Sequence, residues 1–293
     1  MPSLREVRGK IKSVRKTQQV TKAMKMIAAA RVKKAQANLM GSRPYARRVE
    51  ELVMGLAAGL DASDLACPAE FLPRQSAKDS ILLIATSDKG LCGAYNMNLF
   101  KRAMGYLVER RNEGAKVHLF VIGKKGRDFF TRSGFPIAKE YVNFIRQPSF
   151  LQANILATDL LSLYRNDFKI GRVVCLFANF KNMIRQESKF FDLLPVPMPE
   201  AAAKHVLPGD YICEPQRSVI LKQLFDRYVR TIMFKLILES FTSEQASRMN
   251  VMENATKNAS DMIDGLTLLG NNVRQAGITR EILEVISGAD ALA

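Results

Sequence analysis

Long apolar segments are missing from this 293-residue sequence, which contains no run of about eighteen uncharged apolar residues. A helix that crosses the hydrocarbon core of a bilayer needs about 20 such residues, so no transmembrane helix is expected. The first residues are charged from Arg5 onward and contain no apolar stretch of the kind that a secretory signal requires. We therefore expect neither a membrane span nor a secretory leader.

Cysteine and histidine are also scarce. The four cysteines are 25, 83 and 38 residues apart, and neither of the two histidines lies near one of them. Zinc sites need closely spaced cysteine or histidine ligands, so these spacings argue against a metal site. We predict reduced thiols, as in a reducing compartment. The residues concerned are Cys67, Cys92, Cys175, Cys213, His118 and His205.

Catalytic constellations and nucleotide loops are lacking as well. Residues 86–93 follow an expected strand and precede an expected helix, where a phosphate loop would lie. Their glycines fit neither GxxxxGK followed by Ser or Thr nor GxGxxG, so we predict a tight turn. Lys124 and Lys125 begin the next expected helix and are interpreted as solvated surface. Asp88 is the one carboxylate at the end of an expected strand, and alone it supports no mechanism. No catalytic residue, cofactor or metal is predicted.

Acidic residues are almost absent from the first 48 residues, which hold fourteen Lys or Arg and only Glu6, a net charge of +13 out of +16 for the chain. Arg8, Lys12 and Lys16 lie four residues apart on one face of an expected helix, where like charges repel by roughly 0.2–0.5 kcal/mol per pair. A merely solvated face would normally intersperse Glu, so this pattern favours an acidic partner. Nucleic acid and an acidic protein collar are both open at this point.

Helix breakers are rare near the N-terminus. The first 58 residues form one predicted helix, with a seam that advances by threes and fours and is polar in its middle. A second stripe, Val20, Met24 and Ile27, is expected to take over from the seam as a straight helix drifts past a seven-residue repeat. Gly41 and Pro44 predict a kink or an early end. The seam consists of Leu4, Val7, Ile11, Val14, Gln18, Thr21, Lys25, Ala28, Val32, Ala35 and Leu39.

Residues 216–293 predict a second long helix, because they contain no proline and repeat a similar seam. A helix of about 73 residues is about 110 Å long at 1.5 Å per residue, far longer than the average helix of a globular domain. The two long helices are expected to pair with each other in antiparallel orientation. The second seam consists of Met249, Met252, Thr256, Ala259, Ile263, Leu266, Gly270 and Val273.

Between the long helices, residues 78–195 alternate short apolar runs with helical stretches, which is typical of a doubly wound, mostly parallel sheet. Phe180 to Leu194 is predicted to add an edge hairpin, and residues 196–215 a proline-rich linker. The predicted fold is α/β: a long antiparallel coiled coil of the N- and C-terminal helices with an inserted Rossmann-like α/β domain. Strands are expected at 80–85, 117–122 and 173–177, and helices at 97–112, 124–133 and 148–166.

Several long motifs resemble the gamma subunits of F-type ATP synthases. Residues 11–30 (IKSVRKTQQVTKAMKMIAAA) resemble the N-terminal helix of that family, and residues 87–93 (SDKGLCG) resemble its central signature. Residues 244–249 (EQASRM), 254–259 (NATKNA) and 274–282 (RQAGITREI) resemble its C-terminal helix. The resemblance covers the whole chain, with the motifs in the same order.

The resemblance implies a noncatalytic rotor, the central stalk that couples proton flow through a c-ring to conformational cycling of the catalytic beta subunits. The helical pair would lie inside a ring of alternating alpha and beta subunits. The globular part would sit with the epsilon subunit on the c-ring. The chain would be peripheral, at the cytoplasmic face of a bacterial plasma membrane, and held there only through the complex, without nucleic acid.

The resemblance also implies partner contacts for single residues. One group matches the segment that faces an acidic lever of the beta subunit: Lys22, Met24 and Lys25. A second group matches positions that hydrogen-bond to a beta-subunit loop: Arg274, Gln275 and Thr279. Gly277 and Arg280 depart slightly from the residues that are usual in the family.

A third contact is implied for the foot of the stalk. Residues 210–215 (DYICEP) resemble the segment that rests on the c-ring, with Tyr211 and Glu214 as polar contacts. Cys213 stands where an aromatic residue is expected. The close cysteine pair of the redox-sensitive insert in chloroplast members is missing, so no thiol switch is expected.

Two other classes of function compete with the rotor. A nucleic-acid-binding coiled coil accounts for the basic N-terminal zone, but not for the inserted domain, and the first 44 residues contain no aromatic side chain for base stacking. A nucleotide-dependent enzyme built on the α/β domain lacks a phosphate loop. We therefore expect the isolated chain neither to bind ATP tightly nor to hydrolyse it.

Overall fold

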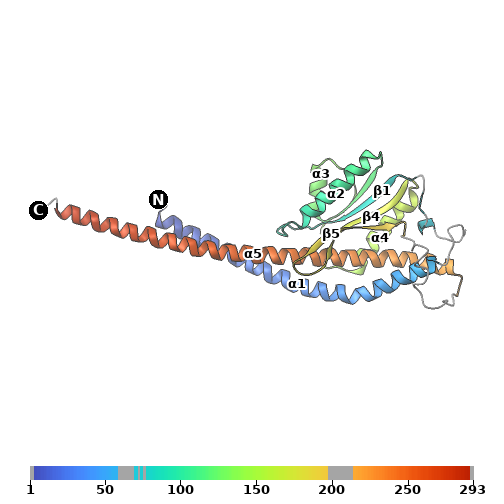
Figure 1. Cartoon of the computed structure of the whole chain (residues 1–293), viewed down its shortest axis with the longest axis horizontal. Coiled ribbons are helices and arrows are strands. Elements are labelled where there is room, and N and C mark those ends of the chain that lie inside the picture. Colours follow the sequence, from blue (N-terminus) through green and yellow to red (C-terminus); the bar gives the residue numbers. More distant parts are fainter. Residues whose placement is uncertain (1–2, 59–68, 72, 75–76, 197–213, 291–293) are drawn as a thin grey trace. The chain divides into compact units, whose positions relative to one another are not determined.

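The computed structural model describes residues 3–58, 69–71, 73–74, 77–196 and 214–290. The chain forms two compact units: a central unit of residues 30–247, and a terminal unit of residues 1–29 and 248–293. Two long helices, α1 (Leu4–Ala58) and α5 (Arg217–Asp290), contribute to both units. Figure 1 shows them as the first and last elements of the chain.

The central unit is built on a five-stranded sheet with strand order β3-β2-β1-β4-β5. The first four strands in this order pair in parallel, and β5 pairs antiparallel with β4. The strands are β1 (Asp79–Ala85), β2 (Val117–Ile122), β3 (Ile137–Tyr141), β4 (Ile170–Phe180) and β5 (Gln186–Leu194). The connecting helices are α2 (Tyr95–Asn112), α3 (Lys124–Arg132) and α4 (Phe150–Asn166), and a short 3-10 helix, η1, spans Ala69–Phe71.

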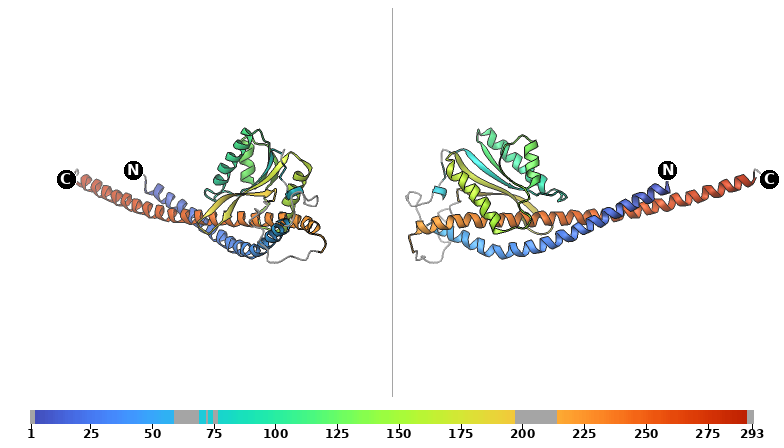
Figure 2. Two further views of the ribbon diagram at one scale, coloured as in Figure 1. Left: turned by 45° about the vertical axis from the view of Figure 1, so that its right-hand side comes forward. Right: turned by 180° about the vertical axis from the view of Figure 1, so that it is seen from behind.

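Both faces of this sheet are covered, as Figures 1 and 2 show. Leu82 and Ile84 of the central strand β1 pack under α2 and α3. Ile81 and Leu83 point to the other face, where α4 packs together with parts of α1 and α5. Because successive side chains of a strand alternate between faces, a strand buried on both sides has to be apolar throughout. The predicted Rossmann-like α/β domain is confirmed, and so is the edge hairpin of β4 and β5.

One strand of the sheet was not predicted. In β3, the side chains of Ala138, Lys139 and Glu140 are exposed, and only Tyr141 is buried. This strand lies at the edge of the sheet, where charged residues are common because one face and one side meet water. An apolar run, the signal that identified the other parallel strands, is therefore absent.

Helix α1 continues through Gly41 and Pro44 to Ala58, in agreement with the single helix predicted over residues 1–58, so the early end that these two residues left open does not occur. A proline inside a helix removes one hydrogen bond and costs about 3 kcal/mol. The next turns bury Val49, Val53 and Leu56 in the core of the central unit, and each such side chain contributes roughly 1.5–3 kcal/mol. This burial outweighs the proline, and α1 curves through this part of the chain in Figure 1 without ending.

The terminal unit is a two-helix coiled coil. Thr21 Oγ1 lies 2.8 Å from Thr256 Oγ1, and Lys25 Nζ lies 2.7 Å from Glu253 Oε1. Near the start of α1, Val7 lies beside Gly270, where an added Cβ would be 3.4 Å from Val7 Cγ1. Residue numbers therefore rise along one helix as they fall along the other, which confirms the antiparallel pairing. The predicted seam residues are buried or half-buried on both helices.

The second stripe of α1 is not used, which corrects the sequence-based expectation. Val20 and Ile27 are 58% and 55% exposed, while Thr21 and Ala28 beside them are buried, and only Met24 of the predicted stripe is half-buried. Two helices that supercoil around each other keep one seam facing the partner, so no second stripe has to replace it. The exposed stripe leaves apolar surface on α1 that α5 does not cover.

The two cysteines in the described part of the chain, Cys92 and Cys175, are buried thiols. Burial raises the pKa of the Cys175 thiol, so this group stays protonated in the core. Cys67 and Cys213 lie outside the described residues. No group of His, Cys, Asp or Glu suited to a metal ion occurs within the described ranges.

Candidate functional site

The predicted contact residues of α1 lie at the surface of the terminal unit. Lys22 is exposed and Met24 is half-buried. Lys25 pairs with Glu253 of α5, and the two side chains are 38% and 54% exposed. An exposed ion pair contributes roughly 0–1 kcal/mol. A carboxylate on another protein can therefore take the place of Glu253 at little cost.

The predicted contact residues of α5 lie on a stretch that α1 does not cover. Val273 is the last half-buried position, and every later residue of α5 whose side chain is described is exposed, including Arg274, Gln275 and Thr279. The Thr279 hydroxyl donates a hydrogen bond to the Gln275 carbonyl at 3.0 Å. These exposed positions include a set of large apolar side chains: Ile278, Ile282, Leu283, Val285 and Ile286.

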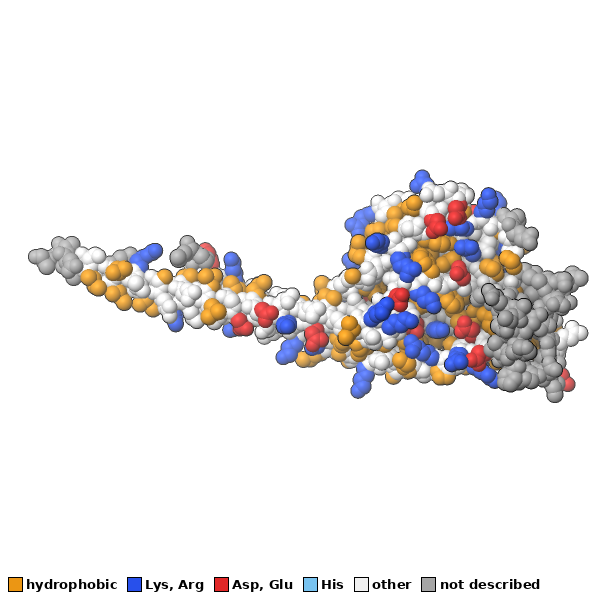
Figure 3. Space-filling view, in the orientation of Figure 1, with side chains coloured by type: hydrophobic (Ala, Val, Ile, Leu, Met, Phe, Trp, Pro, Cys, Tyr) orange, Lys and Arg blue, Asp and Glu red, His pale blue; other side chains and the backbone are white. Residues whose placement is uncertain are grey.

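Figure 3 shows hydrophobic side chains gathered along this end of α5. Most of the stability of a helix in a protein comes from tertiary packing of an apolar face, and exposed apolar patches mark interaction sites. The end of α5 therefore has the composition of a helix that another molecule covers.

The two predicted groups form separate regions and not one site. Glu253 lies opposite Lys25, and Arg274 follows it by 21 residues in the same helix. That separation corresponds to about 30 Å along the helix axis. Of the predicted foot residues, Tyr211 lies outside the described residues, and Glu214 is exposed just before the start of α5.

A basic groove of about 570 Å³ lies on the terminal unit. None of its lining residues is acidic, so the repulsion predicted for this face is not relieved within the groove. Three of its cations belong to the predicted basic face, and Arg15, which lies outside the four-residue spacing, was not predicted. The lining residues are Arg8, Ile11, Lys12, Arg15, Lys16, Gln19 and Thr267.

The signature segment after β1 forms a closed turn, as predicted. The Ser87 hydroxyl donates to the Lys89 carbonyl at 2.8 Å and accepts from the Asn96 amide at 2.7 Å. Asp88 Oδ1 accepts the backbone N–H groups of Lys124 at 2.9 Å and Asn143 at 2.8 Å. The N-terminus of α3, where a Rossmann domain can bind phosphate, thus already holds a carboxylate.

The start of α3 also leaves no room for side chains. Gly123 has φ +96, and a Cβ there would lie 2.4 Å from the Thr86 carbonyl oxygen. A Cβ on Gly126 would lie 2.5 Å from Thr86 Oγ1. The two glycines of the Gly123–Gly126 segment therefore serve close packing between β1 and α3, which supports the structural interpretation of this segment.

The same signature segment holds α5. The Ser247 hydroxyl donates to the Cys92 carbonyl at 2.6 Å. The Tyr95 hydroxyl lies 3.3 Å from the carbonyl oxygens of both Ala85 and Ser240. Sequence reasoning missed these serines, because a serine in a long helix usually lies on its solvated face. Their clustering among apolar neighbours is the signal that was available.

Comparisons with known proteins agree with this architecture. A family model described as ATP synthase matches residues 3–292. The gamma chain of Moorella thermoacetica ATP synthase is 40% identical over 292 residues, which cover 100% of both chains. The gamma chain from Trichlorobacter lovleyi is 37% identical, over 100% of this chain and 99% of the relative. The chain belongs to the family of ATP synthase gamma chains.

Solved structures agree with membership of this gamma-chain family. A chain of the Tetrahymena thermophila mitochondrial ATP synthase central stalk and c-ring matches with a TM-score of 0.59 and 27% identity, over 80% of this chain and 99% of that one. A chain of the Euglena gracilis mitochondrial enzyme matches with a TM-score of 0.66 over 99% and 94%. At 19% identity, the second match shows a similar fold only.

The gamma-chain family resemblance identified from the motifs is thereby confirmed over the full length of the chain. As a gamma-family member, the chain is a subunit of an ATP synthase complex. None of its described helices combines the length and the apolarity needed to cross a bilayer.

Proposed function

We propose that this chain is the central-stalk rotor of an F-type ATP synthase, and that it couples proton flow through a c-ring to conformational cycling of catalytic beta subunits. The observation that carries the proposal is the end of α5. Beyond Val273 it presents exposed apolar turns that no described part of this chain covers. A ring of alternating alpha and beta subunits is the partner that encloses such a helix.

The terminal unit offers two regions to that ring. Arg274, Gln275 and Thr279 would hydrogen-bond to a beta-subunit loop, and Lys22, Met24 and Lys25 would face an acidic segment of the beta subunit. To carry a catalytic site from mostly open to mostly closed, contacts with the two states must differ by about 5.5 kcal/mol. A single exposed ion pair supplies roughly 0–1 kcal/mol. The force on the catalytic subunits is therefore distributed over many contacts, and steric contact by the two helices provides much of it.

The foot of the stalk would be formed by Tyr211 and Glu214 on the c-ring, beside the epsilon subunit. Contact with the membrane would then run only through the complex, at the cytoplasmic face of a bacterial plasma membrane. The absence of a membrane-spanning helix among the described residues is compatible with this location.

The chain itself would be noncatalytic. Asp88 caps α3 at the place where phosphate would bind, and the glycines beside it pack against Thr86. Titration calorimetry of the purified full-length chain with ATP should give no binding in the micromolar range. Micromolar binding would contradict a noncatalytic role.

The rotor proposal is tested by capture of the tagged full-length chain from its own cells after nuclease treatment. We expect alpha and beta subunits to be recovered, identified by mass spectrometry, and a chain that ends at Val273 to recover less of both. Recovery of nucleic acid in their place, from a parallel capture without nuclease treatment, would support the coiled-coil alternative and overturn the rotor.

A further inference from the structure

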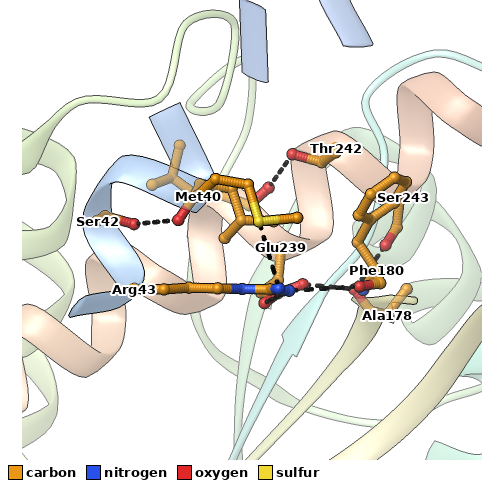
Figure 4. A network of polar contacts seen from close by, with 10 residues as sticks. Met40, Ser42, Arg43, Ala178, Phe180, Glu239, Thr242 and Ser243 are labelled. Carbon is orange, nitrogen blue, oxygen red and sulfur yellow. Dashed lines mark hydrogen bonds and ion pairs between the residues drawn. The ribbon is translucent and has the colours of Figure 1, made fainter. Parts of the chain in front are cut away.

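A buried carboxylate ties three elements of the central unit together. The Glu239 side chain on α5 is only 3% exposed. Its Oε2 accepts the backbone N–H of Phe180, at the end of β4, at 2.9 Å, and its Oε1 lies 3.1 Å from the Arg43 guanidinium of α1. Figure 4 shows this contact with Arg43 and Phe180 on either side of Glu239.

Further hydrogen bonds follow along the next two turns of α5. The Ser243 hydroxyl donates to the carbonyl of Ala178 in β4 at 2.9 Å, and the Ser247 hydroxyl donates to Cys92 at 2.6 Å. The Ser240 carbonyl lies 3.3 Å from the Tyr95 hydroxyl. Within nine residues, α5 is thus bonded to β4, to α1 and to the β1–α2 connection.

This polar zone replaces an apolar one. From Leu221 to Leu238, the buried contacts of α5 are mainly aliphatic and aromatic. From Glu239 to Ser247, most buried positions of α5 are polar. Apolar contact is non-directional. Hydrogen bonds depend steeply on distance and angle, so they hold one rotational setting.

We propose that Glu239 is a positioning residue for energy coupling: it fixes α5 to the sheet against rotation about the helix axis, with Ser243 and Ser247 in supporting roles. The position of the zone in the chain suits this role. Ser247 is the last residue of the central unit, and α5 enters the terminal unit at Arg248. Any torque that passes along α5 between the units meets the sheet for the last time in this zone.

The inference rests on the proposed rotor function, so its test uses assembled ATP synthase in sealed membrane vesicles. ATP hydrolysis and ATP-driven proton pumping are measured on the same vesicles. The rate of pumping divided by the rate of hydrolysis is the coupling ratio of the assembled complexes. A variant that merely destabilises the chain lowers both rates together and leaves the ratio unchanged. For Glu239→Gln, which removes the charge and keeps the shape, we expect the ratio to fall at least threefold.

Three variants keep the test decisive. Glu253→Gln breaks the exposed ion pair with Lys25 on the same two helices and should leave the ratio unchanged. Glu239→Asp retains the charge and should keep part of the coupling ratio that Glu239→Gln loses. Ser243→Ala removes one bond to β4 and should lower the ratio less than Glu239→Gln does, and this variant decides the matter if Glu239→Gln fails to assemble.

The inference is overturned if assembled Glu239→Gln complexes pump protons at the wild-type ratio, or if Glu239→Gln does not assemble and Ser243→Ala is fully coupled. Failure of the proposed function looks different. In that case, vesicles from wild-type cells would contain an active ATP synthase that lacks this chain.

Discussion

The two units hold α1 and α5 together by different means. In the central unit, both helices are packed into the core under the sheet, and the ion pair between them, Arg43 with Glu239, has a carboxylate that is 3% exposed. In the terminal unit, the corresponding pair, Lys25 with Glu253, is open to water on both sides. Close by, the seam carries a Thr21–Thr256 contact in place of an apolar one.

The difference indicates which part of the molecule is complete on its own. Buried apolar area supplies most of the stability of a folded unit, and the central unit has two large apolar clusters around its sheet. The terminal unit has a narrow seam with polar residues in its middle and exposed apolar side chains beside it and beyond it. It depends on surfaces from other molecules, and the central unit does not.

The largest effect is expected from removal of the uncovered end of α5. A chain truncated after Val273 loses Arg274, Gln275, Thr279 and the exposed apolar turns, none of which is covered within the terminal unit. Proton-driven ATP synthesis in vesicles should fall at least tenfold. The melting temperature of the isolated chain should change by only about 1 °C, because turns that the chain does not cover contribute little to its stability, and a full kcal/mol shifts the melting temperature of a domain of 150–250 residues by roughly 2–4 °C. A large decrease in melting temperature together with normal ATP synthesis would show that the end of α5 stabilises the chain and does not contact a partner.

The next comparison concerns the two ion pairs. Glu239→Gln should lower the free energy of unfolding by about 2–3 kcal/mol, since hydrogen bonds to a charged group are worth roughly 1.5–3 kcal/mol. Arg43 limits the loss, because its side chain is 40% exposed and borders a groove of about 930 Å³, so it can turn to water. Glu253→Gln should cost less than about 1 kcal/mol. Urea unfolding of the isolated chain measures both, and equal costs would remove the distinction between the units.

A smaller effect is expected from the basic face of α1. Lys12→Gln or Lys16→Gln removes one of several like charges that line the same groove, and one exposed ion pair to a partner is worth roughly 0–1 kcal/mol. ATP synthesis should therefore fall less than about fivefold, the factor that 1 kcal/mol represents. Abolition of synthesis by Lys12→Gln alone would show that force passes through one residue.

The smallest effect is expected at the polar middle of the seam. Replacement of Thr21 and Thr256 together by Val removes both partners of their contact and keeps their shape, which is nearly neutral or stabilising. Hydrogen exchange of residues 10–30 in the isolated chain should be fast in the wild type, and equal or slower in the double variant. Strong wild-type protection there would mean that the terminal unit is stable without partners.

Much of this architecture could be predicted because it repeats. The seams of α1 and α5 have a regular period, and the central strands are apolar on both faces, so both signals are local and redundant. Pro44 left a kink or an early end open in the predicted N-terminal helix, because a breaker is read locally, while burial of Val49 and Val53 is decided by tertiary contacts. The edge strand β3 carries Lys139 and Glu140 and lacks the apolar run of its neighbours.

The site could be predicted only in part. The contact residues of α1 and α5 came from the family resemblance, and the structure places them at exposed or half-buried positions in the terminal unit. Glu239, Ser243 and Ser247 could not be found in advance, since a polar residue in a helix looks the same in sequence whether it faces water or a strand end. Only the fold brings Phe180 and Cys92 to them.

The rotor assignment is tested most directly by observation of rotation. Ile184, in the connection between β4 and β5, is 87% exposed, and a probe can be attached at Ile184→Cys after Cys67 and Cys213 are replaced by Ser, since Cys92 and Cys175 are buried. The assembled complex is anchored through its beta subunits and given ATP. The account predicts that the probe turns continuously in one direction. A stationary probe on complexes that hydrolyse ATP at the normal rate would contradict it.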